Sequence, residues 1–140
     1  MNTDITKTAS YIITGCAYDV LNEMHYGLLE SAYEAALKWE LEQKGFYVKR
    51  QVYVPLFYKG VELDQDYRLD LLVNDRIIIE LKTVASLLPE HRFQLMNYMR
   101  ITQKPFGILI NFGPNGVQTE KYKLDVELNR VELIADNIIR

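Results

Sequence analysis

Arg68-Leu-Asp70-Leu-Leu-Val-Asn-Asp-Arg-Ile-Ile-Ile-Glu80-Leu-Lys82 places the charged side chains Asp70, Glu80 and Lys82 within the apolar runs at 69–73 and 77–82. The apolar runs, interrupted by Asn-Asp, predict two β-strands over 67–73 and 76–82 that form an antiparallel hairpin. Burying a charged group in such a covered strand is costly unless something compensates the charge. The pattern therefore indicates a functional site on the hairpin.

The length of the hairpin loop sets the strand register. A two-residue turn would pair Asp70 with Ile79 and mix charge into the apolar face, because a one-residue slip exchanges the faces of a strand. A three-residue loop at 74–76 brings Asp70 opposite Glu80 and leaves one face wholly apolar. We prefer this register, since Asn and Asp tolerate the left-handed backbone that such a loop needs. Alternation then assigns four residues of the first strand to the apolar face: Tyr67, Leu69, Leu71 and Val73.

Paired carboxylates on a covered strand are typical of a metal site. In the preferred register the Cβ atoms of Asp70 and Glu80 lie about 5 Å apart, and their charges repel unless a cation lies between them. We expect Mg²⁺ or Mn²⁺, because hard cations take oxygen ligands and Mg²⁺ needs only one or two carboxylates. Lys82 shares the face of Glu80 and could orient water or stabilise charge on phosphate. The alternative is a solvated strand face with a carboxylate–lysine pair.

Two helices carry further candidates. Gly27, Glu30 and Tyr33 recur every three residues along one side of a helix predicted over 28–44. Glu30 is either a site residue or an exposed glutamate favoured by the helix dipole, and Tyr33 is either part of the core or near phosphate. Gln94 and Tyr98 lie one turn apart on a helix predicted over 89–102. Both could donate hydrogen bonds to phosphate, although Tyr98 could equally pack in the core and Gln94 be exposed.

Taken together, these motifs resemble a known superfamily. Asp70 followed by Glu80-x-Lys82 resembles the catalytic core of the PD-(D/E)xK nucleases, with Leu69 where many members have proline. Gly27-Leu-Leu-Glu30-Ser-Ala-Tyr33 is similar to the signature of the bacterial GxxExxY family. Gln94-Leu-Met-Asn-Tyr98 is similar to the Gln-x-x-x-Tyr motif of the exonuclease-like branch of the superfamily. Asn111-Phe112-Gly113 is similar to a further segment of the GxxExxY family.

The resemblance implies a restriction-endonuclease-like fold and a metal-dependent nuclease. Asp70, Glu80 and Glu30 would hold Mg²⁺ or Mn²⁺, together with the backbone carbonyl of Leu81. Lys82 would act on the attacking water. Gln94 and Tyr98 would position phosphate while metal-activated water hydrolyses a phosphodiester bond of nucleic acid, with DNA favoured over RNA.

The composition limits these expectations. The 140 residues predict one domain over 1–140, with 49% hydrophobic and 25% charged residues. The chain has a lone Cys16, and no apolar run approaches the roughly 20 residues of a membrane span. Its N-terminus shows no signal-peptide pattern. We therefore expect a cytoplasmic chain without a membrane partner. The net charge of −3 is unusual for a protein that binds nucleic acid. A catalytically silent nuclease-fold module that binds nucleic acid or a protein, and a homodimer, therefore stay open.

The remaining pattern predicts the order of elements. Helices are expected over 4–24, 28–44 and 89–102, and a further one over the tail, 125–140. Strands are expected over 46–58, 61–73, 76–84, 106–112 and 117–123. The order α-α-β-β-β-α-β-β predicts an α/β (α+β) fold, with a mixed β-sheet flanked by helices.

Overall fold

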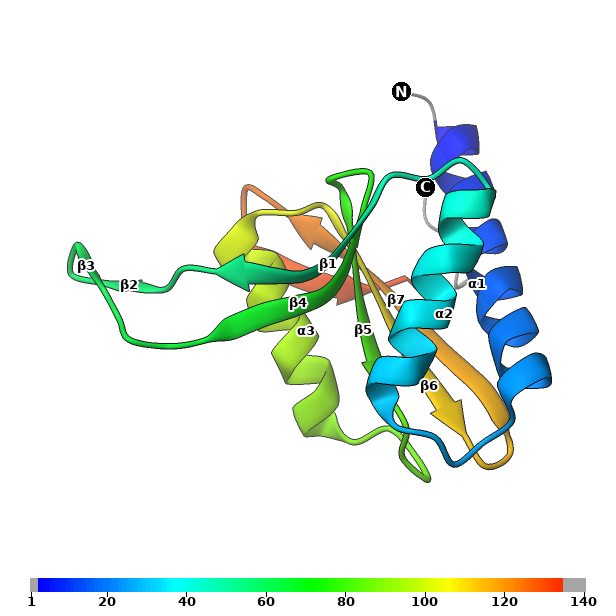
Figure 1. Cartoon of the computed structure of the whole chain (residues 1–140). Helices are drawn as coiled ribbons and strands as arrows, with labels where there is room; N and C mark the ends of the chain where they lie inside the picture. The colour runs from blue at the N-terminus through cyan, green and yellow to red at the C-terminus, as the bar shows by residue number, and fades with distance from the viewer. Residues whose placement is uncertain (1–2, 135–140) are drawn as a thin grey trace.

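A six-stranded mixed sheet lies between two layers of helices in the computed structural model of the chain, which describes residues 3–134 and side chains from Ala9 onward (Figure 1). The helices are α1 (Thr3–Met24), α2 (Glu30–Gln43) and α3 (Pro89–Thr102). The strands are β1 (Val48–Val54), β2 (Phe57–Tyr58), β3 (Val61–Glu62), β4 (Tyr67–Val73), β5 (Ile77–Lys82), β6 (Phe106–Gly113), β7 (Gly116–Asp125) and β8 (Arg130–Leu133).

The sheet order is β1-β4-β5-β6-β7-β8, and β5 and β6 are its parallel pair. A parallel pair needs a crossover connection, which α3 supplies between β5 and β6. The short strands β2 and β3 form a separate hairpin that projects from the sheet at the left of Figure 1. The chain thus brings β4, β5 and α3 together in one uninterrupted run of sequence.

Each face of the sheet has its own hydrophobic core. The helices α1 and α2 cover one face, where Tyr33 and Leu37 pack with residues such as Ile79 and Ile108. The helix α3 covers the other face, where Leu95 and Met99 pack with residues that include Ile78 and Leu109. Consecutive residues of β5 and β6 therefore point into opposite cores, so these central strands are apolar on both faces.

The predicted hairpin register is confirmed. Leu71 pairs with Ile79 and Val73 with Ile77, which requires the three-residue loop. Asn74 and Asp75 have φ values of 52° and 56°, the left-handed conformation that the loop demands.

Strict alternation along β4 was nevertheless wrong at Leu69. This residue packs in the α3-side core, whereas Leu71 and Val73 pack against α1 and α2. The neighbouring strand β1 explains the change, because Gln51 has a φ of 54° and does not pair with Asp70. A left-handed residue interrupts the ladder there, and the side chains beyond it turn to the other face.

The predicted tail helix was also wrong over its described part. Residues 126–129 form a turn, in which the Leu128 amide donates to Asp125 Oδ1, and β8 then pairs with β7. The helical spacing of apolar residues in this segment arises from a turn followed by a strand. The rest of the predicted helix, 135–140, lies outside the described residues.

Close packing fixes the distance of α3 from the sheet. Gly107 on β6 lies beneath the helix, and a Cβ atom there would come within 2.6 Å of Met99 Sδ and 2.9 Å of Leu95 Cδ1. The absence of a side chain at Gly107 thus lets the backbone of β6 approach α3 closely.

In the described part of the chain, no helix is both long and apolar enough to cross a bilayer.

Candidate active site

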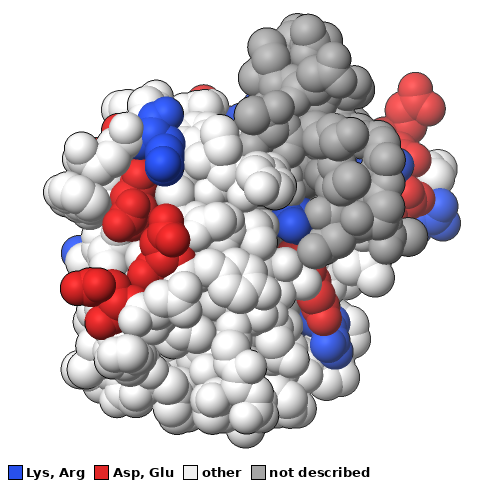
Figure 2. Space-filling model, turned by 90° about the vertical axis from the view of Figure 1, so that its right-hand side faces the viewer, with Lys and Arg blue, Asp and Glu red and all other residues white. Residues whose placement is uncertain are grey.

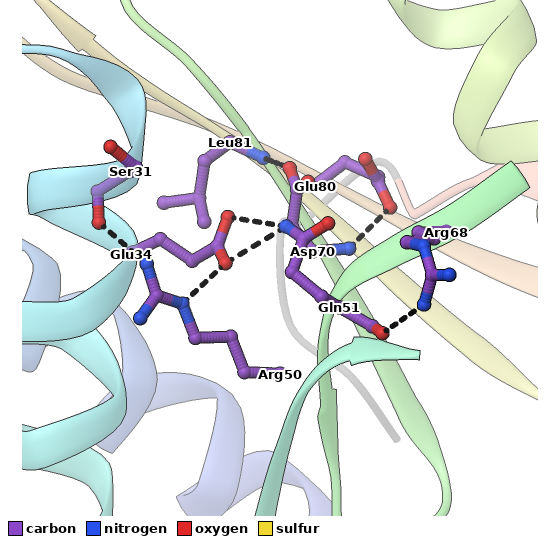
Figure 3. A network of polar contacts seen from close by, with 8 residues as sticks. All are labelled: Ser31, Glu34, Arg50, Gln51, Arg68, Asp70, Glu80 and Leu81. Carbon is purple, nitrogen blue, oxygen red and sulfur yellow. Dashed lines mark hydrogen bonds and ion pairs between the residues drawn. The ribbon is translucent and has the colours of Figure 1, made fainter. Parts of the chain in front are cut away.

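Asp70 and Glu80 lie side by side on β4 and β5, where the regular ladder between the strands ends (Figure 3). The backbone amide of Asp70 donates to Glu80 Oε1 at 3.1 Å, and the amide of Leu81 donates to Asp70 Oδ2 at 2.8 Å. Each carboxylate therefore accepts a hydrogen bond from the backbone of the opposite strand. These bonds hold both side chains in place, as the predicted register requires.

The environment of this pair disfavours its negative charge. Burial raises the pKa of Glu80 well above its ordinary value, and the neighbouring charge of Asp70 raises it further. Burial also raises the pKa of Asp70. The charge of Lys82 acts in the opposite direction on both carboxyl groups, which places its ammonium close to them. A second positive charge at this position would stabilise both carboxylates in their ionised form.

Glu30 approaches the pair from α2. Burial raises the pKa of Glu30, Asp70 raises it further, and Lys82 lowers it. The loop before the helix sets this position: the Tyr33 hydroxyl donates to the carbonyl of His25 and accepts from the amide of Leu28 at 3.1 Å.

Gly27 and Tyr33 thus act through the loop that begins α2. Gly27 has a φ of 115°, which a side chain would strain. Tyr33 is fully buried, and its ring stacks on Phe112 at a centroid distance of 4.9 Å. Of the alternatives that the sequence leaves open, the structure places Tyr33 in the core. Leu29, the residue immediately before α2, is 79% exposed.

Lys82, Gln94 and Tyr98 form a hydrogen-bonded chain beside the carboxylates. Lys82 Nζ donates to Gln94 Oε1 at 3.1 Å, and Gln94 in turn hydrogen-bonds to the Tyr98 hydroxyl. The charges of Glu80 and Asp70 add to burial in raising the pKa of Tyr98. The structure thus brings together the six side chains predicted from sequence. Of the alternatives for Tyr98, the structure shows the packing of its ring in the α3-side core, while a hydrogen bond from its hydroxyl to phosphate stays a prediction.

Sequence reasoning missed a fourth carboxylate, Glu34, which is buried one turn after Glu30 (Figure 3). Arg50 Nε donates to Glu34 Oε1 at 2.7 Å, and Gln51 Nε2 donates to both carboxylate oxygens at 2.9 and 3.0 Å. The spacing of four residues from Glu30 was a signal, because it places both side chains on one helix face. The left-handed Gln51 opposite Asp70 had no signal in the sequence.

Asn111 supports the segment that follows Lys82. This buried amide accepts from the Val84 amide at 2.9 Å and donates to the Val84 carbonyl at 2.8 Å. A third hydrogen bond runs from Asn111 Nδ2 to Gln118 Oε1 at 3.0 Å. Because Asn111 pairs with Lys82 across β5 and β6, it fixes the backbone where β5 ends.

The donor set fits a divalent cation that prefers oxygen. Among the side chains that the structure describes, residues 9–134, no three His, Cys, Asp or Glu converge into a ready-made metal cage. Mg²⁺ does not need one, since it commonly binds one or two carboxylates and completes its shell with water and phosphate oxygens. Asp70 and Glu80 can supply that pair, and Glu30 lies close enough for its pKa to respond to Asp70.

Over its described residues, the side of the molecule formed by α1 and α2 has few positive charges that could bind a polyanion. Figure 2 shows the side of the molecule formed by α1 and α2, where uncharged surface predominates and Asp and Glu side chains gather on the left of the view. Exposed aromatic residues of these helices include Tyr11, Tyr18 and Trp39. Across the described part of this face, Lys and Arg form no broad patch of the kind that binds phosphates.

Two solved structures resemble the fold of this chain. The crystal structure of SSO0001 is similar with a TM-score of 0.52 and 18% identity over 83% of this chain, which spans only 61% of that protein. An alkaline exonuclease from Laribacter hongkongensis gives a TM-score of 0.45 and 15% identity over 80% of this chain and 78% of its own. No curated protein matches the sequence significantly.

The sequence profile of the PD-(D/E)XK nuclease superfamily matches residues 7–124. This range contains all six predicted site residues and the three-layer core that positions them. The mixed sheet flanked by helices is accordingly the restriction-endonuclease-like fold, as predicted. The match covers most of the chain, and the protein therefore belongs to the PD-(D/E)XK nuclease superfamily.

Proposed function

We propose that this protein is a divalent-metal-dependent nuclease of the GxxExxY group that hydrolyses phosphodiester bonds, with DNA favoured over RNA as the substrate. One observation carries the proposal: the buried carboxylate of Glu80 and the partly buried carboxylate of Asp70 share a site with the ammonium of Lys82. A fold needs no such group of buried charges for its stability, because well-packed apolar residues serve at least as well.

The side chains can divide the work of hydrolysis. Asp70 and Glu80, with Glu30 and the Leu81 carbonyl, would hold Mg²⁺ or Mn²⁺. When bound, this cation would lower the pKa of water and neutralise charge on phosphate. Water then adds to phosphorus while the bond to the leaving oxygen breaks, so that one product ends in phosphate and the other in hydroxyl.

Lys82, Gln94 and Tyr98 would complete the site from the other side. The ammonium of Lys82 can stabilise the negative charge that grows on the phosphoryl oxygens, because it lies in a partly desolvated position. Gln94 holds that ammonium through its Oε1 atom, which limits the directions in which Lys82 can point. The Tyr98 hydroxyl, fixed by Gln94, is placed to donate to a phosphate oxygen.

The test is cleavage of labelled single- and double-stranded DNA and RNA with Mg²⁺ or Mn²⁺, by wild type and by Lys82→Ala prepared identically. We expect cleavage that EDTA abolishes and that Lys82→Ala lowers by roughly 10²–10⁴-fold. Lys38→Ala is the matched control, because Lys38 is also half-buried and pairs with Glu42 on α2 rather than with the site. Cleavage that survives Lys82→Ala would refute the assignment of this site.

The alternative is a catalytically silent module that binds nucleic acid or a protein. The net charge of −3 favours it, since tight binding to nucleic acid usually needs a basic surface. Folded protein that binds Mg²⁺ in calorimetry but cleaves none of the four substrates would support this alternative.

A further inference from the structure

A pocket of about 330 Å³ adjoins the candidate active site between β4 and α3. Its lining is mostly apolar and aromatic: Tyr67, Phe93, Tyr98 and Ile101, with the polar side chains Glu90, Gln94 and Asn97. Tyr67 and Tyr98 meet edge to face, with ring centroids 6.0 Å apart. Phe93 is 60% exposed at the pocket, although a phenylalanine ring gains most when it is covered.

Two of the lining residues also belong to the candidate active site. The Gln94 side chain accepts from Lys82 Nζ, and the Tyr98 hydroxyl hydrogen-bonds to Gln94. A group that enters the pocket therefore lies directly beside the position where phosphate would bind. On the far side, the Arg100 guanidinium donates to Asn97 Oδ1 at 3.1 Å, which places a positive charge next to the lining.

We propose that this pocket binds one unpaired nucleobase next to the phosphate that is cleaved, so that the enzyme acts on single-stranded nucleic acid. The inference rests on the proposed nuclease function and names the substrate class of the same site. Aromatic rings can stack on the face of a base of any sequence. The amides of Gln94 and Asn97 and the carboxylate of Glu90 can hydrogen-bond with the edge of the base.

The surroundings of the pocket favour a single strand over a duplex. A paired base has its edge and both faces occupied by its partner and its neighbours, so it must leave the stack before it can enter such a pocket. Binding to intact duplex relies instead on extended positive charge, and this chain carries a net charge of −3. Stacking supplies affinity that does not depend on many phosphate contacts.

The test measures binding separately from cleavage. Labelled 12-mers of single-stranded DNA, single-stranded RNA of the same sequence and duplex DNA are titrated by fluorescence anisotropy in Ca²⁺, and their integrity is checked afterwards. We expect single strands to bind more tightly than duplex, and Phe93→Ala to weaken their binding about tenfold, with no change for duplex. The two single-strand titrations distinguish DNA from RNA as the source of the base.

Phe57→Ala is the matched control. Phe57 lies on β2 outside the pocket and is 59% exposed, so its substitution removes the same kind of ring at the same exposure. We expect Phe57→Ala to bind like wild type. Equal losses in both variants, binding of Phe93→Ala within twofold of wild type, equal binding of duplex, or no binding of any single strand would each overturn the pocket assignment.

A second measurement locates the base. A single abasic position is moved along the strand, and we expect one position at which its presence weakens wild-type binding about tenfold but leaves Phe93→Ala unaffected. Uniform behaviour at all positions would contradict a discrete base pocket. Binding that depends on Phe93 but is not accompanied by cleavage would refute the proposed hydrolysis and leave the base pocket standing. Cleavage that is the same for Phe93→Ala as for wild type, and the same for single strands as for duplex, would refute the base pocket and leave the nuclease function standing.

Discussion

Replacement of Gly107 by alanine tests whether close contact with β6 sets the position of α3. The new Cβ atom would lie 2.6 Å from Met99 Sδ and 2.9 Å from Leu95 Cδ1, whereas ordinary contacts begin at 3.4 Å. The helix side chains must therefore retreat by about 0.5–0.8 Å, the difference between these distances. Leu95 and Met99 are fully buried in the α3-side core, so neither can turn toward solvent.

The strain outweighs the benefit of a stiffer unfolded chain. Overpacking of this kind costs about 1–3 kcal/mol. Alanine in place of glycine also stabilises the folded protein by roughly 0.4–1 kcal/mol, because the unfolded chain then loses less conformational freedom on folding. We therefore expect Gly107→Ala to lower the free energy of unfolding by about 1–2 kcal/mol and Tm by about 4–8 °C. Urea unfolding and a thermal scan measure both quantities.

Gly15→Ala is the control for this prediction. Gly15 is exposed on α1, and a Cβ atom there would meet nothing within 4 Å. The substitution should stabilise the protein by roughly 0.5–1 kcal/mol, since alanine is the better helix former. A Gly107→Ala variant as stable as Gly15→Ala would refute the argument that contact with β6 holds α3, and with it the reason that Gln94 and Tyr98 lie where they do.

Three further predictions concern polar groups that are buried or partly buried. A raised carboxyl pKa stabilises the fold below the pKa of the unfolded chain, and this stability is lost as pH rises through the folded pKa. Glu80→Gln should therefore melt above wild type at pH 8 in EDTA, and a difference that persists unchanged at pH 4 would contradict this reading. Hydrogen bonds from Arg92 lower the pKa of Glu120. The stability that the ionised Glu120 contributes is therefore present above the unfolded pKa and lost as pH falls. Glu120→Gln should lower the free energy of unfolding by about 1 kcal/mol at pH 7 and by less toward pH 3, as measured by urea unfolding. Asn111→Ala should cost about 2–4 kcal/mol by the same method, because it removes the partners of the partly buried backbone of Val84 and leaves a cavity at the buried Asn111. An unchanged stability would show that other groups hold this segment.

The parts of the site predicted from sequence were those governed by local rules. Alternation and the Asn74-Asp75 loop were enough to place Asp70 opposite Glu80, because only one register separates charge from the apolar face. The start of α3 at Pro89 followed from the preference of proline for a first helical turn.

Other features depended on contacts between distant segments. Nothing near Gln51 in the sequence requires a left-handed residue. Two long-range hydrogen bonds hold its conformation: the Gln51 side chain donates to Glu34 on α2, and Arg68 donates to the Gln51 carbonyl. The position of Leu69 follows from this interruption, so alternation alone could not predict it. The tail was misread because a turn at Asp125 and a strand reproduce helical spacing by coincidence.

The continuity of β4, β5 and α3 has a consequence for folding. Five of the six candidate residues lie between Asp70 and Tyr98, and only Glu30 comes from a distant part of the chain. Loop closure within this segment is cheap, so the hairpin and its crossover helix can meet early in folding. Glu30 joins this group only when α2 docks on the sheet. If α2 docks after the rate-limiting barrier, a divalent cation held by Glu30 together with Asp70 and Glu80 would slow unfolding more than it accelerates refolding.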